Sequence, residues 1–501
     1  GIGKWALTSL THSPKHNSTR AVISRWSSVR GSLQPPEGVP KLLRNVVCPS
    51  TTFQIQIRVK FENVITFKTF PENKIQIPNV KPLEKTSNFQ ESLRLTLVIG
   101  QAFALIPVDG IFSKNAMNVR FVWSSWKCGY AFISILGQVY MTVMCIYKVS
   151  YSNKTLNAIT PLIFYGTTCV TTVMFFRIAR YWPNLCQHIA RSEELDPNFD
   201  YKLTYRCRIT CVVVLLLATL EHILSLLSAF AETMTCYSNT TIYNGFVIHF
   251  YPWVFESLPF SYPLGVITQF VHFQSTFIWN FSDLFVMCMS YYLTSRLGQI
   301  NKKLLEVRSK YLPESFWRTT REEYSRVTQL VRRVDDVISG IVFISFANNL
   351  FFICLQLFNT LEDGINGATY CNGHVNRTTP LSGYEAATYF FFSLIYLILR
   401  SIAVSLIASQ VNSASTVPAL VLYDVPSPVY CVEVQRFLDQ VTCETVALSG
   451  LKFFKVTRGL LLVVAGKIVT YELVMVQFNA PSTTTPTITS AGSPNNTTII
   501  N

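Results

Sequence analysis

The sequence predicts an all-α membrane protein with seven transmembrane helices, a cytoplasmic N-terminus and an extracellular C-terminus. Of its 501 residues, 49% are hydrophobic and only 14% charged, and the mean hydropathy is +0.30, which is too apolar for an ordinary soluble protein. Seven apolar segments are long enough to cross a bilayer, and basic residues and glycosylation sequons fall in alternating connections between them. The lipid bilayer is therefore an expected partner.

The region before the first span falls into two parts. Residues 1–88 are polar, basic and repeatedly interrupted by proline, so we expect a largely flexible cytoplasmic region with one weakly alternating, strand-like run at 53–60. Residues 89–127 should form an interfacial helix and the segment that leads to the first span. The apolar run Leu95 to Ile106 is too short to cross a hydrocarbon core, which takes about 20 helical residues.

The transmembrane domain is expected over 128–478. Its apolar segments lie at 128–149, 157–179, 209–230, 267–295, 337–360, 386–410 and 456–478. Connections 297–336 and 411–455 mix apolar and basic residues, so we expect them to form cytoplasmic anchor segments. Within the second, apolar residues recur at helical spacing from Ser427 to Gly450, which predicts an amphipathic helix. The tail 479–501 is rich in Thr, Ser and Pro and should be disordered and extracellular.

The basic residues determine the orientation. The net charge of +14 is compatible with nucleic-acid binding, but Lys and Arg occupy connections between spans rather than one soluble domain, so we expect no nucleic-acid partner. They crowd connection 296–336 and recur in 180–208 and 411–458, whereas 231–266 and 479–501 contain none. By the positive-inside rule, the basic connections are cytoplasmic.

Glycosylation sequons give an independent test of this orientation. Those in the loops and tail assigned to the outside begin at Asn153, Asn239, Asn376, Asn495 and Asn496. Asn17 and Asn280 also begin sequons, but they lie in the predicted cytoplasm and inside a span, so we expect neither to be used. The agreement between charge and sequons supports an N-terminus inside the cell.

Two cysteines, Cys236 and Cys371, lie in predicted extracellular loops, where oxidation is permitted. A disulfide between them and a pair of isolated thiols are equally compatible with the sequence.

The last apolar segment carries Lys467, Thr470, Tyr471, Glu472 and Gln477. A membrane anchor would avoid such groups, because a charged residue at the centre of a spanning helix costs roughly 2.5 to 3.5 kcal/mol on insertion scales. This helix should therefore border the interior of a helix bundle or a conduit.

The same segment carries a family resemblance. Thr470-Tyr471, followed after five residues by Gln477-Phe478, resembles the signature of insect gustatory receptors. Blocks similar to the sugar-receptor branch lie at Asn88–Arg94, Pro161–Gly166, Trp279–Phe285, Ser345–Cys354 and Ala447–Arg458, the last continuing into Val464–Val474. The resemblance covers about residues 88 to 478. The sequence departs from the expected pattern at Lys467 and Ser282.

The resemblance implies a tetrameric, ligand-gated, non-selective cation channel with the odorant-receptor fold and a cytoplasmic anchor domain. It would act in the plasma membrane of gustatory receptor neurons, as a homo- or hetero-tetramer with other gustatory receptor subunits. The outer half of the seventh helix would line the pore, with Gln477 and Phe478 at the constriction above Thr470 and Tyr471. A ring of Phe side chains can gate by dewetting, and Gln amides offer oxygens to a cation. The alternative is that Gln477 is an interfacial residue at the end of a span.

Polar residues inside other spans suggest the ligand site. They are Glu221, His222, Trp279, Asn280, Asp283, Asn348, Asn349, Gln356, Tyr389 and Tyr396. Carboxylates and amides beside aromatic rings suit a sugar ligand, whose hydroxyls need hydrogen-bond partners and whose C–H faces stack on rings. We favour Asp283 and Trp279, and expect Asp283→Ala to abolish the sugar-evoked current while leaving surface expression intact. The alternative is that these groups hydrogen-bond between helices and hold the bundle together.

Other function classes fit less well. A metabotropic seven-helix chemoreceptor predicts an extracellular N-terminus, and a solute transporter predicts an internal half-repeat that is not evident here. The pair Glu221 and His222 could serve as acid and base in an intramembrane enzyme. No metal-ligand set, nucleophile elbow or phosphate-binding glycine loop accompanies them, so we expect neither an enzyme nor a cofactor or metal.

Overall fold

The described residues of the computed structural model are 88–113, 115–151, 156–196, 200–236, 241–363, 381 and 384–479. The strand-like run at 53–60 and the tail after Asn479 lie outside them, and both stay predictions. Within the described residues, regular structure is helical apart from one two-stranded hairpin. The all-α prediction is confirmed.

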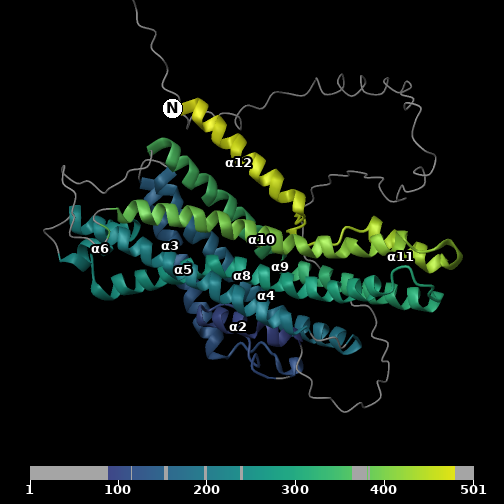
Figure 1. Ribbon diagram of the computed structural model, residues 1–501. Coiled ribbons are helices and arrows are strands. Elements are labelled where there is room, and N and C mark those ends of the chain that lie inside the picture. Colours follow the sequence, from purple (N-terminus) through teal and green to yellow (C-terminus); the bar gives the residue numbers. More distant parts are fainter. Residues whose placement is uncertain are drawn as a thin grey trace, which may run out of the picture. The chain divides into compact units, whose positions relative to one another are not determined.

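Long helices make up most of the structure (Figure 1). They are α2 (Asn88–Ala102), α3 (Trp126–Tyr151), α4 (Leu156–Leu195), α5 (Tyr201–Cys236), α8 (Tyr262–Glu306), α9 (Glu314–Asp363), α10 (Glu385–Tyr423), α11 (Val432–Cys443) and α12 (Arg458–Asn479). The shorter elements are η2 (Ala116–Asn118), α6 (Ile242–Phe250), α7 (Pro252–Phe255), η3 (Ser427–Val429), β1 (Ser449–Gly450) and β2 (Phe454–Lys455).

Among the described residues, five helices are long and apolar enough to cross a membrane. They are α3, α4, α5, α9 and α10, and each contains one of the predicted segments. The segment 267–295 lies in α8, whose buried face carries Asn280, Asp283 and other polar side chains. The segment 456–478 lies almost wholly in α12. A polytopic arrangement is thus evident, whereas the number of seven spans stays a prediction.

Several helices are much longer than a bilayer requires. Helix α8 has 45 residues and α9 has 50, which at 1.5 Å per residue gives about 68 and 75 Å, against a hydrocarbon core of about 30 Å. The predicted anchor segments 297–336 and 411–455 are largely continuations of α8, α9 and α10. Helix α11 packs on α9 and α10, where the buried Phe437 meets the ring of Tyr324 at 5.3 Å.

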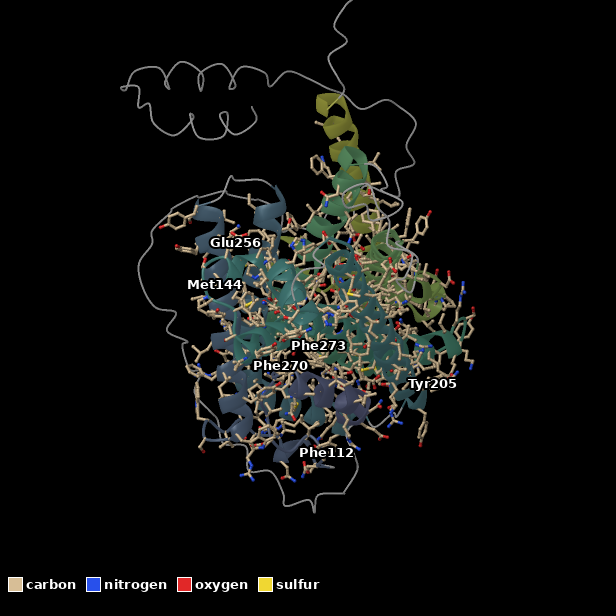
Figure 2. All side chains as sticks on the ribbon, turned by 90° about the vertical axis from the view of Figure 1, so that its left-hand side faces the viewer. Phe112, Met144, Tyr205, Glu256, Phe270 and Phe273 are labelled. Atoms are coloured by element: carbon tan, nitrogen blue, oxygen red, sulfur yellow. The ribbon has the colours of Figure 1, made fainter. Side chains whose placement is uncertain are left out.

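Helix α8 lies at the centre of the packing. It contacts α2, α3, α4, α5, α9 and α10, and Phe281 and Phe285 on it are buried. Figure 2 shows side chains filling the space between the helices, with Phe273 of α8 among them. Helix α2 packs against the same core through Phe89, whose ring meets that of Tyr292 edge-on at 4.8 Å.

The predicted helix from Ser427 to Gly450 is wrong at both ends. The helix covers only Val432–Cys443, and the chain then becomes extended and enters the hairpin of β1 and β2. Asp335 of α9 explains the change, because its buried carboxylate accepts hydrogen bonds from Ser449 N at 2.6 Å and Ser449 Oγ at 2.8 Å. Val446 and Leu448 are 2% and 0% exposed, so the apolar pattern predicted burial correctly but not the helix.

Helix α12 follows the hairpin and packs against α9 and α10 (Figure 1). Much of its apolar surface remains uncovered, since Leu462 is 75%, Val463 60% and Val469 58% exposed. Lys467 is exposed as well.

Candidate functional site

The candidate site is built on one face of α10. Tyr389, Ser393, Tyr396 and Arg400 recur at intervals of four, three and four residues, which places them in a row along one side of a helix. This row faces polar side chains from α5, α8 and α9. We call the resulting set the interior polar network: Glu221, Asn280, Asp283, Ser345, Asn349, Gln356, Ser393, Tyr396 and Arg400.

An ion pair between Asp283 and Arg400 lies at the centre of the network. Arg400 Nε lies 2.9 Å from Asp283 Oδ2 without being aligned for a hydrogen bond, and the side chains are 0% and 1% exposed for Asp283 and Arg400. Asp283 also accepts hydrogen bonds from Asn349 Nδ2 at 3.0 Å and from the Ser345 hydroxyl. Arg400 donates to Asn349 Oδ1 at 3.2 Å and to Asn280 Oδ1. These bonds offset part of the cost of removing two charges from water.

Aromatic side chains enclose the guanidinium of Arg400. Its central carbon lies 4.6 Å from the ring centroid of Trp279 and 5.2 Å from that of Tyr396, within the range of a cation–π interaction. The Tyr396 hydroxyl donates to Asn280 Oδ1 at 2.9 Å. Trp279 in turn packs on Phe352 of α9, with ring centroids 4.7 Å apart.

A second branch of the network lies further along α10. The Ser393 hydroxyl donates to Glu221 Oε1 at 2.7 Å and accepts from Gln356 Nε2 at 3.0 Å. The Tyr389 hydroxyl interacts with Ser393 and Ser225. Helices α5, α9 and α10 are therefore joined at this level by side-chain hydrogen bonds.

His222 lies apart from the network although it follows Glu221 directly. Its ring is 5.8 Å from that of His272 and 5.3 Å from that of Phe273. His272 Nδ1 lies 2.8 Å from the Tyr165 hydroxyl. Glu221 and His222 thus contact different groups, and the geometry does not make them an acid–base pair.

Comparisons with known proteins identify the family. A family model described as the trehalose receptor matches residues 71–487. The chain is 33% identical over 432 residues to the gustatory receptor for sugar taste 64f of Drosophila melanogaster, covering 83% of this chain and 88% of that one. This chain belongs to the sugar branch of the insect gustatory receptors.

Two further comparisons bear on this gustatory receptor. It is 32% identical over 397 residues to gustatory receptor 5a for trehalose of the same fly, covering 78% of this chain and 85% of that one. Its fold is similar to that of the insect olfactory receptor OR5 from Machilis hrabei, solved in complex with eugenol, with a TM-score of 0.55 and 14% identity over 78% of this chain and 99% of that one. The family resemblance drawn from the sequence is confirmed. The relatives are receptors and not enzymes, which agrees with the prediction that this protein is not an enzyme.

Sequence reasoning missed three members of the network in this receptor: Ser345, Ser393 and Arg400. A signal for Arg400 was present, since it is the one charged residue in the apolar segment 386–410. A buried arginine in such a segment needs an acidic partner, and Asp283 was already a candidate.

Two polar atoms of the predicted ligand set keep unused bonding capacity. Trp279 Nε1 and Gln356 Oε1 are buried and have no hydrogen-bond partner among the described residues. One is a donor and the other an acceptor, which are the two hydrogen-bonding functions of a hydroxyl group. Asn280, Asp283 and Asn349 are hydrogen-bonded within the interior polar network.

The predicted pore residues belong to α12. Thr470 is exposed, and its hydroxyl donates to the carbonyl of Gly466 at 2.8 Å. Tyr471, Gln477 and Phe478 lie in the helix, but their side chains are outside the described part of the receptor, so their pore role stays a prediction.

The predicted extracellular modifications fall outside the described side chains. These positions are Asn153, Asn239, Asn376, Cys236 and Cys371. Glycosylation and the disulfide therefore stay predictions.

Proposed function

We propose that this chemoreceptor is a sugar-gated, non-selective cation channel in the plasma membrane of gustatory receptor neurons. One observation carries the proposal: relatives that are named for sugar taste and for trehalose match it at 32 to 33% identity over more than three quarters of both chains. Both relatives are named for sugars, and the polar and aromatic character of the network suits the same class of ligand.

The proposed topology has seven spans, with α8 and α12 added to the five apolar helices. A spanning helix can carry polar groups when neighbouring helices shield them from lipid. Helix α8 is shielded in this way, because Asn280, Asp283 and Ser290 are each completely buried. The N-terminus would be cytoplasmic and the C-terminus extracellular, as the distribution of basic residues indicates.

The proposed channel is a tetramer with α12 at its axis. Supporting this, α12 packs against α9 and α10 and leaves apolar residues such as Leu462 uncovered. An apolar helix surface of this kind suits contact with other copies or with lipid. In the tetramer, Gln477 and Phe478 would form the constriction.

The proposed sugar site lies where α5, α8, α9 and α10 meet. Trp279 would supply its Nε1–H donor and Gln356 an acceptor, while Glu221 and Asn280 keep the neighbouring polar groups in place. A ligand that used the two open bonding positions would add contacts between α8 and α9 without breaking the central ion pair. Binding could then favour one arrangement of these helices over another.

Excised-patch recording tests the proposal. Cells that express this chain alone should give a cation current when a panel of sugars is applied to the extracellular face without nucleotide. Patches from cells that express a Gln477→Ala variant should show altered relative permeability among cations with an unchanged sugar concentration dependence. A sugar response that occurs in intact cells but never in nucleotide-free patches, even with co-expressed gustatory subunits, would instead support a metabotropic receptor.

A further inference from the structure

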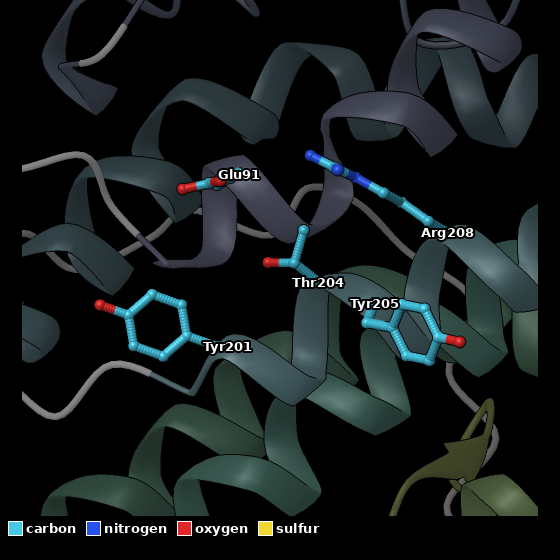
Figure 3. Close-up of a pocket in the computed structure, with 5 residues that line it drawn as sticks. All are labelled: Glu91, Tyr201, Thr204, Tyr205 and Arg208. Atoms are coloured by element: carbon cyan, nitrogen blue, oxygen red, sulfur yellow. The ribbon is translucent and has the colours of Figure 1, made fainter.

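A second site lies away from the polar network, between α2 and the first two turns of α5. It is a cavity of about 240 Å³, open to the surface and lined by Glu91, Tyr201, Thr204, Tyr205 and Arg208 (Figure 3). The α5 residues recur at intervals of three, one and three, so they share one face of the helix. Helix α2, which carries Glu91, packs against α5, and on this face Thr204 is buried whereas Tyr201, Tyr205 and Arg208 are exposed.

The cavity presents two opposite charges that do not neutralise each other. Glu91 and Arg208 both line it, yet they make no ion pair with each other or with any other residue in the described part of the chain. Thr204 is only 8% exposed, and its Oγ1 has no hydrogen-bond partner among the described residues. Figure 3 shows its hydroxyl directed toward the side of the cavity where Glu91 and Tyr201 lie. The cavity therefore suits a ligand that carries both charges.

The surface of α5 indicates the depth of this cavity in a membrane. Tyr201 and Tyr205 are 79% and 67% exposed, and Lys202, Arg206 and Arg208 are exposed on the same two turns. Beyond them, the exposed side chains become apolar: Ile209, Val212, Val213, Leu216, Leu217 and Leu220. Tyrosine and basic residues followed by an apolar surface mark the level of the lipid headgroups.

We propose that this cavity binds the headgroup of a zwitterionic phospholipid of the phosphoethanolamine or phosphocholine class. Arg208 pairs with the phosphate. The Thr204 hydroxyl, directed toward Glu91 and Tyr201, accepts a hydrogen bond from the ammonium group of phosphoethanolamine. Glu91 pairs with the ammonium group, which also lies against the ring of Tyr201 in a cation–π contact. The acyl chains follow the apolar surface of α5. The assignment rests on the placement of this chain in a membrane and is independent of sugar gating.

Lipid retention in nanodiscs tests the assignment. The full-length receptor is reconstituted with phosphatidylethanolamine or with anionic phosphatidylglycerol, and retained lipid is counted by native mass spectrometry after detergent extraction. In phosphatidylethanolamine, Glu91→Gln and Arg208→Gln should each lower retention about tenfold, because each removes a hydrogen bond to a charged group. Arg206→Gln, which removes the same charge from the same helix turn but does not line the cavity, should retain the wild-type amount.

Comparing retention of the two lipids distinguishes a site for a zwitterionic headgroup from a basic surface that binds any phosphate. With phosphatidylglycerol, Arg208→Gln should still lower retention, whereas Glu91→Gln should not. Thr204→Val, which keeps the side-chain shape, should lower retention of phosphatidylethanolamine but not of phosphatidylglycerol, and it serves as the test if a charge variant fails to fold. Unchanged phosphatidylethanolamine retention in Glu91→Gln, or an equal loss in Arg206→Gln, would overturn the proposal. Equal competition by soluble glycerophosphoethanolamine at matched concentration would show that a free phosphate ester, not a membrane lipid, is the ligand.

Discussion

The buried ion pair between Asp283 and Arg400 predicts that Asp283→Ala destabilises the receptor. The substitution leaves the guanidinium of Arg400 buried at 1% exposure without its carboxylate, and it removes the acceptor of Ser345 and Asn349. Removing one partner of a buried ion pair destabilises a protein by about 3 to 5 kcal/mol, largely because the remaining charge is left uncompensated. This is a large part of the total stability of an ordinary domain, about 5 to 15 kcal/mol.

We therefore expect Asp283→Ala to lower both the amount of receptor at the cell surface and the thermal midpoint of the detergent-solubilised protein. The structure changes the expectation drawn from the sequence alone, in which surface expression stayed intact. Arg400→Met should have a comparable effect, because it leaves the Asp283 carboxylate buried without its cation. The measurements are surface biotinylation and fluorescence-detected size-exclusion chromatography after heating.

The double variant Asp283→Ala/Arg400→Met distinguishes a charge effect from lost packing. Because it removes both charges, its destabilisation should be smaller than the sum of the single variants by roughly 1 to 3 kcal/mol. A matched control is the ion pair of Lys302 and Glu306, whose charged groups lie 3.9 Å apart and whose side chains are 80% and 64% exposed. Single and double alanine variants of this pair should change the free energy of unfolding by less than about 0.5 kcal/mol. Wild-type stability in Asp283→Ala, or strict additivity in the double variant, would refute the reasoning.

Three further predictions concern other parts of the receptor. Trp279→Phe should raise the sugar concentration for half-maximal current about three- to tenfold, with normal surface expression, because it removes the Nε1–H donor that has no partner within the described part of the receptor. Trp253→Phe removes an indole donor that likewise has no partner there, and it should leave the sugar sensitivity unchanged. Asp335→Asn should destabilise the hairpin before α12 by about 1 to 3 kcal/mol, because the carboxylate that binds Ser449 and Lys452 becomes an amide. Limited proteolysis should then cleave the chain faster near β1. A hydrogen bond from Arg321, and a weaker contribution from Arg436, lower the pKa of Glu433 below its ordinary value of 4.5, although desolvation acts in the opposite direction. The contribution of Glu433 to stability is therefore present at neutral pH and is lost as the pH falls through that lowered pKa. Glu433→Gln should remove this part of the acid sensitivity in thermal scans between pH 3 and pH 7.

The sequence was sufficient for the elements that depend on local pattern. Five long helices and the family followed from apolar segments and motif blocks, because spanning helices need about 20 apolar residues whatever their tertiary partners. Most members of the polar network were found in the same way, since Asp283 and Glu221 are conspicuous in apolar surroundings. Their pairing could not be predicted, because Asp283 and Arg400 are 117 residues apart and only the packing of α8 on α10 brings them together.

The hairpin before α12 was missed for a related reason. Its residues have a helix-like apolar pattern, and two of its turn residues, Leu451 and Lys452, adopt positive φ angles of 47° and 64° although neither is glycine. Such conformations persist where surrounding contacts stabilise them. Here Lys452 forms ion pairs with Asp335 and Asp336 of α9, and a partner on another helix cannot be seen in the local sequence.

The base of α12 and the candidate sugar site are connected through α9. Asp335 binds the hairpin, and Ser345 on the same helix, ten residues and about 15 Å further along, binds Asp283. Further along α9, Phe352 belongs to a small apolar cluster with Leu397 of α10. Trp279 of α8 and Ile468 of α12 pack against this cluster. A ligand that contacts Trp279 therefore touches a cluster that α12 shares.

Because coupling between two sites is reciprocal, a change in this cluster should act on both. We expect Phe352→Leu, which loosens the contact with Trp279, to shift the sugar concentration for half-maximal current and the open probability without sugar in the same recordings. Phe391→Leu, at an exposed position of α10, is the control for loss of a ring. If Phe352→Leu changed sugar sensitivity while leaving the unliganded open probability at the wild-type value, Trp279 would contact the ligand but the cluster would not transmit its binding to α12.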